Sequence, residues 1–245
     1  MRRDITKHYS PILNKEMDIV AYGDYGFALL LLPTAAADFL EYERFQMIET
    51  LKPYIDGGMI KVYSINSINN ESWLNENMDP RDKAIRHEQF NNYVYNEVVP
   101  FIFEDCNGRV DIITCGASLG ALHCANLFFK RPDLFAGTIA MSGSYDLSDY
   151  SDGYFDELCY FNSPMHYLPN LEDETILNEM RKSKHIHILT GQGNYEKPKA
   201  TEEISAILNS KNVPNNAELW GFDVPHDWPT WRKMIPYVLE TKFNK

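Results

Sequence analysis

Short apolar runs alternate with longer amphipathic stretches along most of the chain. Six runs have the length and composition of buried strands, and they cover residues 27–32, 59–65, 110–115, 136–142, 186–190 and 217–222. Parallel strands need helical crossovers, so near-continuous apolar strands separated by helical stretches indicate a parallel sheet with helices on both faces. The pattern therefore predicts an α/β fold with a mostly parallel sheet, and residues 17–21 are expected to add an antiparallel strand.

In the stretches between the apolar runs, apolar residues recur at the spacing of one face of a helix. Phe90, Val94, Val98 and Ile102 form one apolar face, and Asp79 followed by a proline is suited to begin that helix. Further helices are predicted over residues 119–131, 200–212 and 230–243. Residues 145–170 depart from this rhythm, since they are aromatic, acidic and weakly periodic. We expect a single domain over residues 1–245, with a cap or lid formed by residues 145–170.

The charge and composition of the chain limit which kinds of molecule it can bind. The chain has 245 residues and a formal net charge of −12, which argues against nucleic acid or an anionic membrane as the main partner. Its four cysteines show no C-x-x-C pair, and no apolar stretch has the length of a signal peptide or a membrane span. The sequence thus predicts a cytoplasmic protein with reduced thiols that acts on a small molecule and can form a homo-oligomer.

A serine between two glycines interrupts the strand-to-helix transition at residues 116–120, "GASLG". The motif G-x-S-x-G is common by chance, but here a β-branched run precedes it and a helical stretch follows at once. This is the context of a nucleophile elbow, in which a strained turn presents the serine hydroxyl above the sheet. Ser118 is therefore the predicted nucleophile.

A serine hydroxyl needs a base, and a third group must orient that base. His226 follows the last strand by a short loop and precedes the last helix, which is where a hydrolase of this topology carries its histidine. Glu196, after the strand at residues 186–190, is the predicted acid, and Asp146 is the alternative. His123 is expected to be a packing residue, and no histidine cluster predicts a metal site.

The tetrahedral oxyanion of such a reaction needs two backbone amides. Leu119 is predicted to supply one amide, and Thr34, or alternatively Ala35, supplies the other from the loop after the strand at residues 27–32. The predicted walls of the substrate pocket are aromatic: Trp73, Tyr145 and Trp228.

The sequence resembles the putative esterase family of α/β-hydrolases, which includes esterase D and the mycolyltransferases. The resemblance is carried by "LLLLPTAAADFLEYE", "ITCGASLGALHCANLFFKRPDLFAGTIAMSGSYD", "ILTGQGNYE" and "VPHDWPTWRKMIPYVL". It implies the same triad of Ser118, Glu196 and His226. Ala117 and Ala121 stand where esterase D has histidine and glycine, so its thioesterase activity is not carried over.

These features predict a serine esterase that forms an acyl-enzyme on Ser118 and needs no cofactor. A tyrosine-rich surround favours a sugar-linked or aromatic acyl ester over a long lipid. Two alternatives stay open at this point: an acyltransferase with the same triad, and a non-catalytic binding protein on a hydrolase scaffold.

Overall fold

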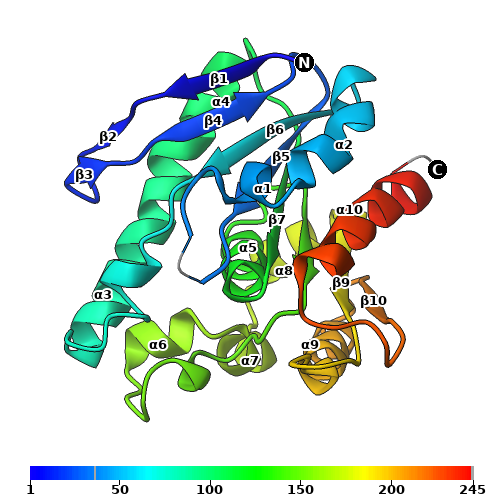
Figure 1. The fold of residues 1–245 in the computed structure, drawn as a ribbon. Coiled ribbons are helices and arrows are strands. Elements are labelled where there is room, and N and C mark those ends of the chain that lie inside the picture. The colour runs from blue at the N-terminus through cyan, green and yellow to red at the C-terminus, as the bar shows by residue number, and fades with distance from the viewer. Residues whose placement is uncertain (36, 244–245) are drawn as a thin grey trace.

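The computed structural model describes residues 1–35 and 37–243. Eight strands form one mixed sheet (Figure 1). In spatial order they are β1 (Arg3–Thr6), β4 (Ile19–Tyr22), β6 (Ile60–Ile65), β5 (Phe27–Leu32), β7 (Ile112–Ala117), β8 (Gly137–Met141), β9 (His185–Thr190) and β10 (Asn216–Leu219). The pairs from β6 to β10 are parallel, whereas β4 pairs antiparallel with both β1 and β6. A separate hairpin joins β2 (Tyr9–Ser10) and β3 (Lys15–Glu16). The predicted α/β fold and the antiparallel addition are confirmed, and five of the six predicted strands are buried, whereas the edge strand β10 is partly exposed.

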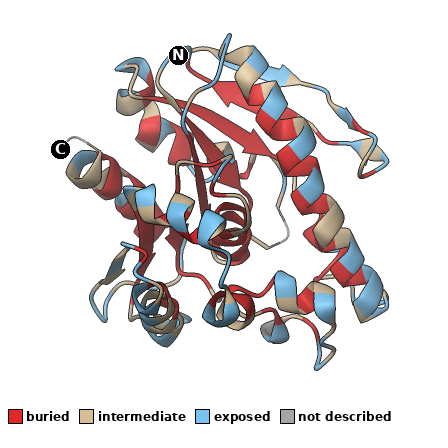
Figure 2. Ribbon diagram, turned by 180° about the vertical axis from the view of Figure 1, so that it is seen from behind, coloured by how far each residue is buried: buried red, intermediate tan, exposed pale blue. Residues whose placement is uncertain are grey.

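Helices cover both faces of this sheet, because its central strands are apolar on both sides. In β5, Leu30 and Leu32 pack into one core, and Leu29 and Leu31 pack into the other. The first core is covered by α3 (Pro80–Tyr93), α4 (Val99–Asp105), α5 (Leu119–Lys130), α8 (Glu174–Lys182) and α9 (Pro198–Ser210). The second is covered by α1 (Glu41–Arg44), α2 (Met47–Asp56) and α10 (Trp228–Lys242). In Figure 2 the central strands and α5 are buried, while the outer helices show exposed stripes.

The helix predicted from the four-residue spacing begins where expected and contains an irregular turn. The Asp79 carboxylate caps α3 by accepting from the Arg81 amide at 2.9 Å. A spacing of four drifts around an α-helix of 3.6 residues per turn. A π-helical turn over Val94–Val98, between α3 and α4, offsets the drift, because it is wider than an α-helical turn. All four apolar residues of the predicted face are consequently buried.

Residues 145–170 form four short helices, which are η3 (Leu147–Asp149), α6 (Glu157–Phe161), α7 (Pro164–Tyr167) and η4 (Leu168–Asn170). Buried Asn162 ties this segment to the main body, because its side-chain oxygen accepts from Asn91 at 2.6 Å and from Asn126 at 2.9 Å. Its amide nitrogen donates to Glu88 at 2.9 Å. These bonds hold the segment on α3 and α5 as a cap, and its opening as a lid stays a prediction.

The four cysteines are free thiols, and three of them are buried. Among the helices of the described residues, none combines the length and the apolar character that crossing a lipid bilayer requires.

Candidate active site

The site lies at the carboxyl edge of the parallel strands, where four loops meet. Ser118 follows β7, Ser142 follows β8, Glu196 lies in the loop after β9, and His226 lies in the loop after β10. Adjacent parallel strands end at the same edge, so residues distant in sequence are brought together there. The Ser118 amide donates to Met141 O at 3.0 Å, which places the serine turn beside the end of β8.

Ser118 has a strained backbone, with φ 57° and ψ −125°. A residue with a side chain rarely adopts this conformation, which costs of order 1–3 kcal/mol and is typical of functional turns. Both flanking glycines are required sterically. A Cβ on Gly116 would lie 2.2 Å from Gly120 O, and a Cβ on Gly120 would lie 2.6 Å from the carbonyl oxygens of Leu32 and Pro33. The G-x-S-x-G motif is thus a tight strand–turn–helix unit that packs against the end of β5.

Glu196 and His226 face each other across two loops. Glu196 Oε2 lies 3.5 Å from His226 Nδ1, with the glutamate side chain fully buried and the histidine side chain 24% exposed. This distance is longer than an ordinary hydrogen bond, and contacts of this kind often shorten when substrate binds. The loops are fixed together, since the His226 amide donates to Asn194 O at 3.0 Å. The carboxylate can therefore orient the imidazole and leave Nε2 for proton transfer.

Two hydroxyls and an indole, which the sequence did not reveal, support this carboxylate. Ser142 donates to Glu196 Oε1 at 2.7 Å, and Thr190 donates to Oε2 at 2.9 Å. Trp231 donates from Nε1 to Ser142 Oγ at 3.0 Å, and its ring packs edge-on against His226 at 5.1 Å between centroids. Burial alone raises the pKa of Glu196, but the nearby His226 imidazole and hydrogen bonds from Ser142 and Thr190 outweigh it and bring the pKa below its ordinary value. Glu196 is therefore held as a carboxylate.

The alternative acid, Asp146, occupies a different environment. Its Oδ1 accepts from the Ser148 amide at 2.8 Å and from Ser163 Oγ at 3.3 Å, and lies 3.6 Å from His166 Nδ1. Asp146 thus begins a short helix and faces another histidine. Of the two acids predicted from the sequence, Glu196 is the one placed against His226.

The two predicted oxyanion donors differ in whether their backbone amides already have a hydrogen-bond acceptor. Leu119 is the first residue of α5, and the amides of the first helical turn have no partner within a helix. Thr34, by contrast, is engaged by the buried Glu41, whose carboxylate accepts from the Thr34 amide at 2.8 Å and also from its hydroxyl. An amide that already donates to a carboxylate is not free for an oxyanion. The geometry therefore favours Ala35, the alternative donor in the same loop.

The predicted pocket walls are packed side chains. Trp73 is 4% exposed and donates from Nε1 to His87 Nδ1 at 2.9 Å. Trp228 is 7% exposed and stacks on Phe45 at 4.6 Å between ring centroids. Tyr145 is fully buried, but it belongs to the lining of a hollow next to the loop of Glu196. The roles of these three residues in substrate binding stay predictions.

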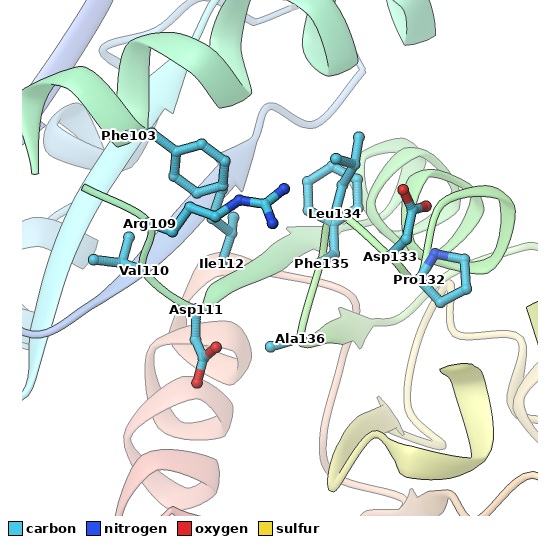
Figure 3. A pocket seen from close by; sticks show the side chains of 10 residues that line it. All are labelled: Phe103, Arg109, Val110, Asp111, Ile112, Pro132, Asp133, Leu134, Phe135 and Ala136. Carbon is cyan, nitrogen blue, oxygen red and sulfur yellow. The ribbon is translucent and has the colours of Figure 1, made fainter. Parts of the chain in front are cut away.

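Two surface hollows lie at opposite edges of the sheet. The hollow beside Tyr145 encloses about 370 Å³ and is lined by charged side chains that include Asp146, Lys199 and Glu203. Figure 3 shows another hollow, of about 320 Å³, into which the Arg109 guanidinium extends over the Phe103 ring. Its lining residues precede β7 and β8, so it lies at the amino edge of the sheet, opposite to Ser118. The hollow beside Tyr145 is lined by residues that follow β8 and β9, so it lies at the carboxyl edge, next to the loop of Glu196.

His123 is a buried packing residue, as predicted, and its Nε2 donates to Asn69 Oδ1 at 2.9 Å. Asp227 caps α10 by accepting from the Trp228 amide at 2.7 Å. Within the described part of the chain, no group of three or more His, Cys, Asp or Glu side chains is arranged to hold a metal ion.

A parallel sheet with a strained serine turn, a histidine loop and a buried acid at one edge defines the α/β-hydrolase class. The family model described as "Putative esterase" matches residues 61–240, and the chain belongs to this family. It is accordingly a carboxylic ester hydrolase by family. No curated protein is significantly similar to the sequence.

Solved structures of similar fold cover nearly the whole chain. A ferulic acid esterase is 17% identical, with a TM-score of 0.72 and coverage of 97% of this chain and 96% of that one. The S-formylglutathione hydrolase of Staphylococcus aureus is 15% identical, with a TM-score of 0.70 and coverage of 98% and 97%. The ferulic acid esterase of Anaeromyces mucronatus, bound to ferulic acid, is 13% identical, with a TM-score of 0.69 and coverage of 99% and 90%. At these identities the likeness concerns the fold.

Proposed function

We propose that the protein hydrolyses carboxylic esters through an acyl-enzyme on Ser118. His226 Nε2 takes the hydroxyl proton as Ser118 Oγ attacks the ester carbonyl, and the amides of Leu119 and Ala35 bind the oxyanion. The imidazolium then gives its proton to the departing alcohol. A water molecule, activated by the same imidazole, releases the carboxylic acid and restores the serine. No cofactor enters any of these steps.

One observation carries this proposal. A fully buried carboxylate faces His226 Nδ1 at the same sheet edge as a serine whose backbone is held at φ 57°. A scaffold that only bound ligands would gain nothing from a buried ionised acid behind an imidazole, because burying charge is costly unless the charge is used or fully paired. The arrangement thus favours catalysis over passive binding.

For the substrate we propose an ester with an aromatic or sugar-linked acyl group. Two proteins of the same fold are ferulic acid esterases, and ferulic acid is an aromatic acid. The hollow beside Tyr145 has a volume suited to a single ring with polar substituents, and its lining includes both lysines and acids.

The test is labelling with a fluorophosphonate probe, followed by hydrolysis of p-nitrophenyl acetate, p-nitrophenyl decanoate and methyl ferulate. We expect labelling at Ser118 alone, loss of labelling and hydrolysis in Ser118→Ala, and a higher kcat/KM for the aromatic and short esters than for the decanoate. Equal rates for the wild type and Ser118→Ala would refute the proposal. Added alcohol acceptors distinguish transfer from hydrolysis, because a transferase would form the new ester in place of the acid.

A further inference from the structure

The backbone at the proposed oxyanion donor is held from its carbonyl side by one asparagine. Asn69 Nδ2 donates to Thr34 O at 3.1 Å and to Ala35 O at 2.8 Å. In a trans peptide unit the C=O and the N–H point in opposite directions. The bond from Asn69 to Thr34 O therefore directs the Ala35 N–H away from Asn69. Asn69 is buried and Ala35 is half-buried, so the Ala35 N–H points away from a buried side chain.

Asn69 is in turn oriented by the helix of the nucleophile. Its side-chain nitrogen donates to two carbonyls, so its oxygen must be the acceptor toward His123 Nε2, at 2.9 Å. His123 lies in α5, which begins directly after Ser118. Burial lowers the pKa of His123 to about 4, so the ring is neutral at pH 7 with its proton on Nε2. The oxyanion loop and the elbow helix are thus connected through one neutral hydrogen-bonded pair.

A second histidine keeps His123 in place. Trp73 Nε1 donates to His87 Nδ1, which assigns the proton of His87 to Nε2. The His87 and His123 rings pack edge to face at 4.8 Å between centroids. Neither His87 Nε2 nor His123 Nδ1 has a hydrogen-bond partner among the described residues, so the contact between the two rings is one of packing. Burial lowers the pKa of His87 well below its usual range, so both rings are neutral.

We propose that Asn69 is a positioning residue for the oxyanion donor of Ala35 and that His123 sets its orientation. This inference rests on the proposed function, since the donor matters only if an oxyanion forms. Without the Asn69 amide, the Thr34–Ala35 peptide can rotate and its N–H leaves the oxyanion. The ground-state substrate makes little use of that donor, so the loss appears in kcat rather than in KM.

The experiment compares Asn69→Ala with Asn126→Ala in the full chain. Asn126 is an equally buried asparagine on α5, and it bonds Asn162 and Tyr167 rather than the oxyanion loop. We expect Asn69→Ala to lower kcat by about ten- to a hundredfold with KM unchanged. The Ki of an aryl trifluoromethyl ketone, which forms a tetrahedral adduct on Ser118, should rise by the same factor. Asn126→Ala should change neither quantity.

Equal kcat and Ki values in the two asparagine variants would overturn the proposal. If Asn69→Ala does not fold, His123→Leu and His123→Gln decide the matter. Glutamine keeps a donor for Asn69 Oδ1 and should retain a kcat about tenfold above that of the leucine variant. Equal kcat values for these two variants would also overturn it. Failure of the proposed function looks different, because the wild type would then show no activity that depends on Ser118.

Discussion

Replacing Glu196 by glutamine removes the charge of the proposed acid and keeps its shape. During attack by Ser118, His226 becomes an imidazolium directly beside this carboxylate. At an effective dielectric constant of about 20, two unit charges separated by the observed 3.5 Å attract each other by about 5 kcal/mol. That energy corresponds to roughly a 3,000-fold change in rate. The buried position of the Glu196 side chain limits screening by solvent and salt.

We therefore expect Glu196→Gln to lower kcat for a p-nitrophenyl ester by about 10³-fold, with KM nearly unchanged. The glutamine oxygen can still accept from Ser142, so the fold should persist. Steady-state kinetics measure the loss, with Ser118→Ala as the background and Asp146→Asn as the matched control. A Glu196→Gln enzyme within tenfold of the wild type, or an equal loss in Asp146→Asn, would refute the assignment of the acid.

The same carboxylate predicts a pH dependence of stability. Because the folded pKa of Glu196 lies below its usual 4.5, its ionised form stabilises the fold above pH 4.5. This contribution is lost as the pH falls through the folded pKa. Urea unfolding of the wild type and Glu196→Gln should therefore converge in acid, and parallel stability curves over that range would contradict the shift.

Three further predictions concern single positions. Gly120→Ala places a Cβ 2.6 Å from two carbonyl oxygens at the end of β5, so the loop that follows β5 must move. We expect kcat to fall at least tenfold and the Tm of thermal unfolding to decrease. Burial raises the pKa of Glu41 above 4.5, so its ionisation costs stability as the pH rises through the folded pKa. Glu41→Gln should then gain stability over the wild type at pH 8, and the gain should vanish toward pH 4 in urea titrations. Burial raises the pKa of Cys124 to about 12, so it should resist a disulfide reagent in the native protein, while half-exposed Cys106 reacts first.

The sequence predicted those features of the site that are local to one element or follow from strand order. The turn at Ser118 is encoded by adjacent glycines, and the loops of Glu196 and His226 follow successive strands. Both signals depend only on neighbours along the chain and on the rule that parallel strands end at one edge. The helices of the second face, α1 and α2, lack such a marker and were not predicted.

What the sequence could not reveal are the polar partners supplied by other elements. Ser142 and Trp231 come from the end of β8 and from α10, and their contacts with Glu196 and His226 exist only in the packed fold. For the same reason the sequence does not distinguish Thr34 from Ala35 as the oxyanion donor, and that assignment stays a prediction. Which of two successive amides is free depends on Glu41 and Asn69, and nothing in the spacing of the chain indicates where these side chains reach.

The site contains two buried carboxylates whose pKa values are displaced in opposite directions. Glu196 receives donors from two hydroxyls and faces an imidazole, and its pKa is lowered. Burial dominates at Glu41, whose hydrogen-bond donors among the described residues are the amide and hydroxyl of Thr34, and its pKa is raised. The difference suits the proposed chemistry, since a firm negative charge behind His226 stabilises an imidazolium. An ionised Glu41, close to the loop that is proposed to bind the oxyanion, would repel the negative charge that develops there. A carboxyl group with a raised pKa is protonated more readily, so it can hold this loop with less repulsion.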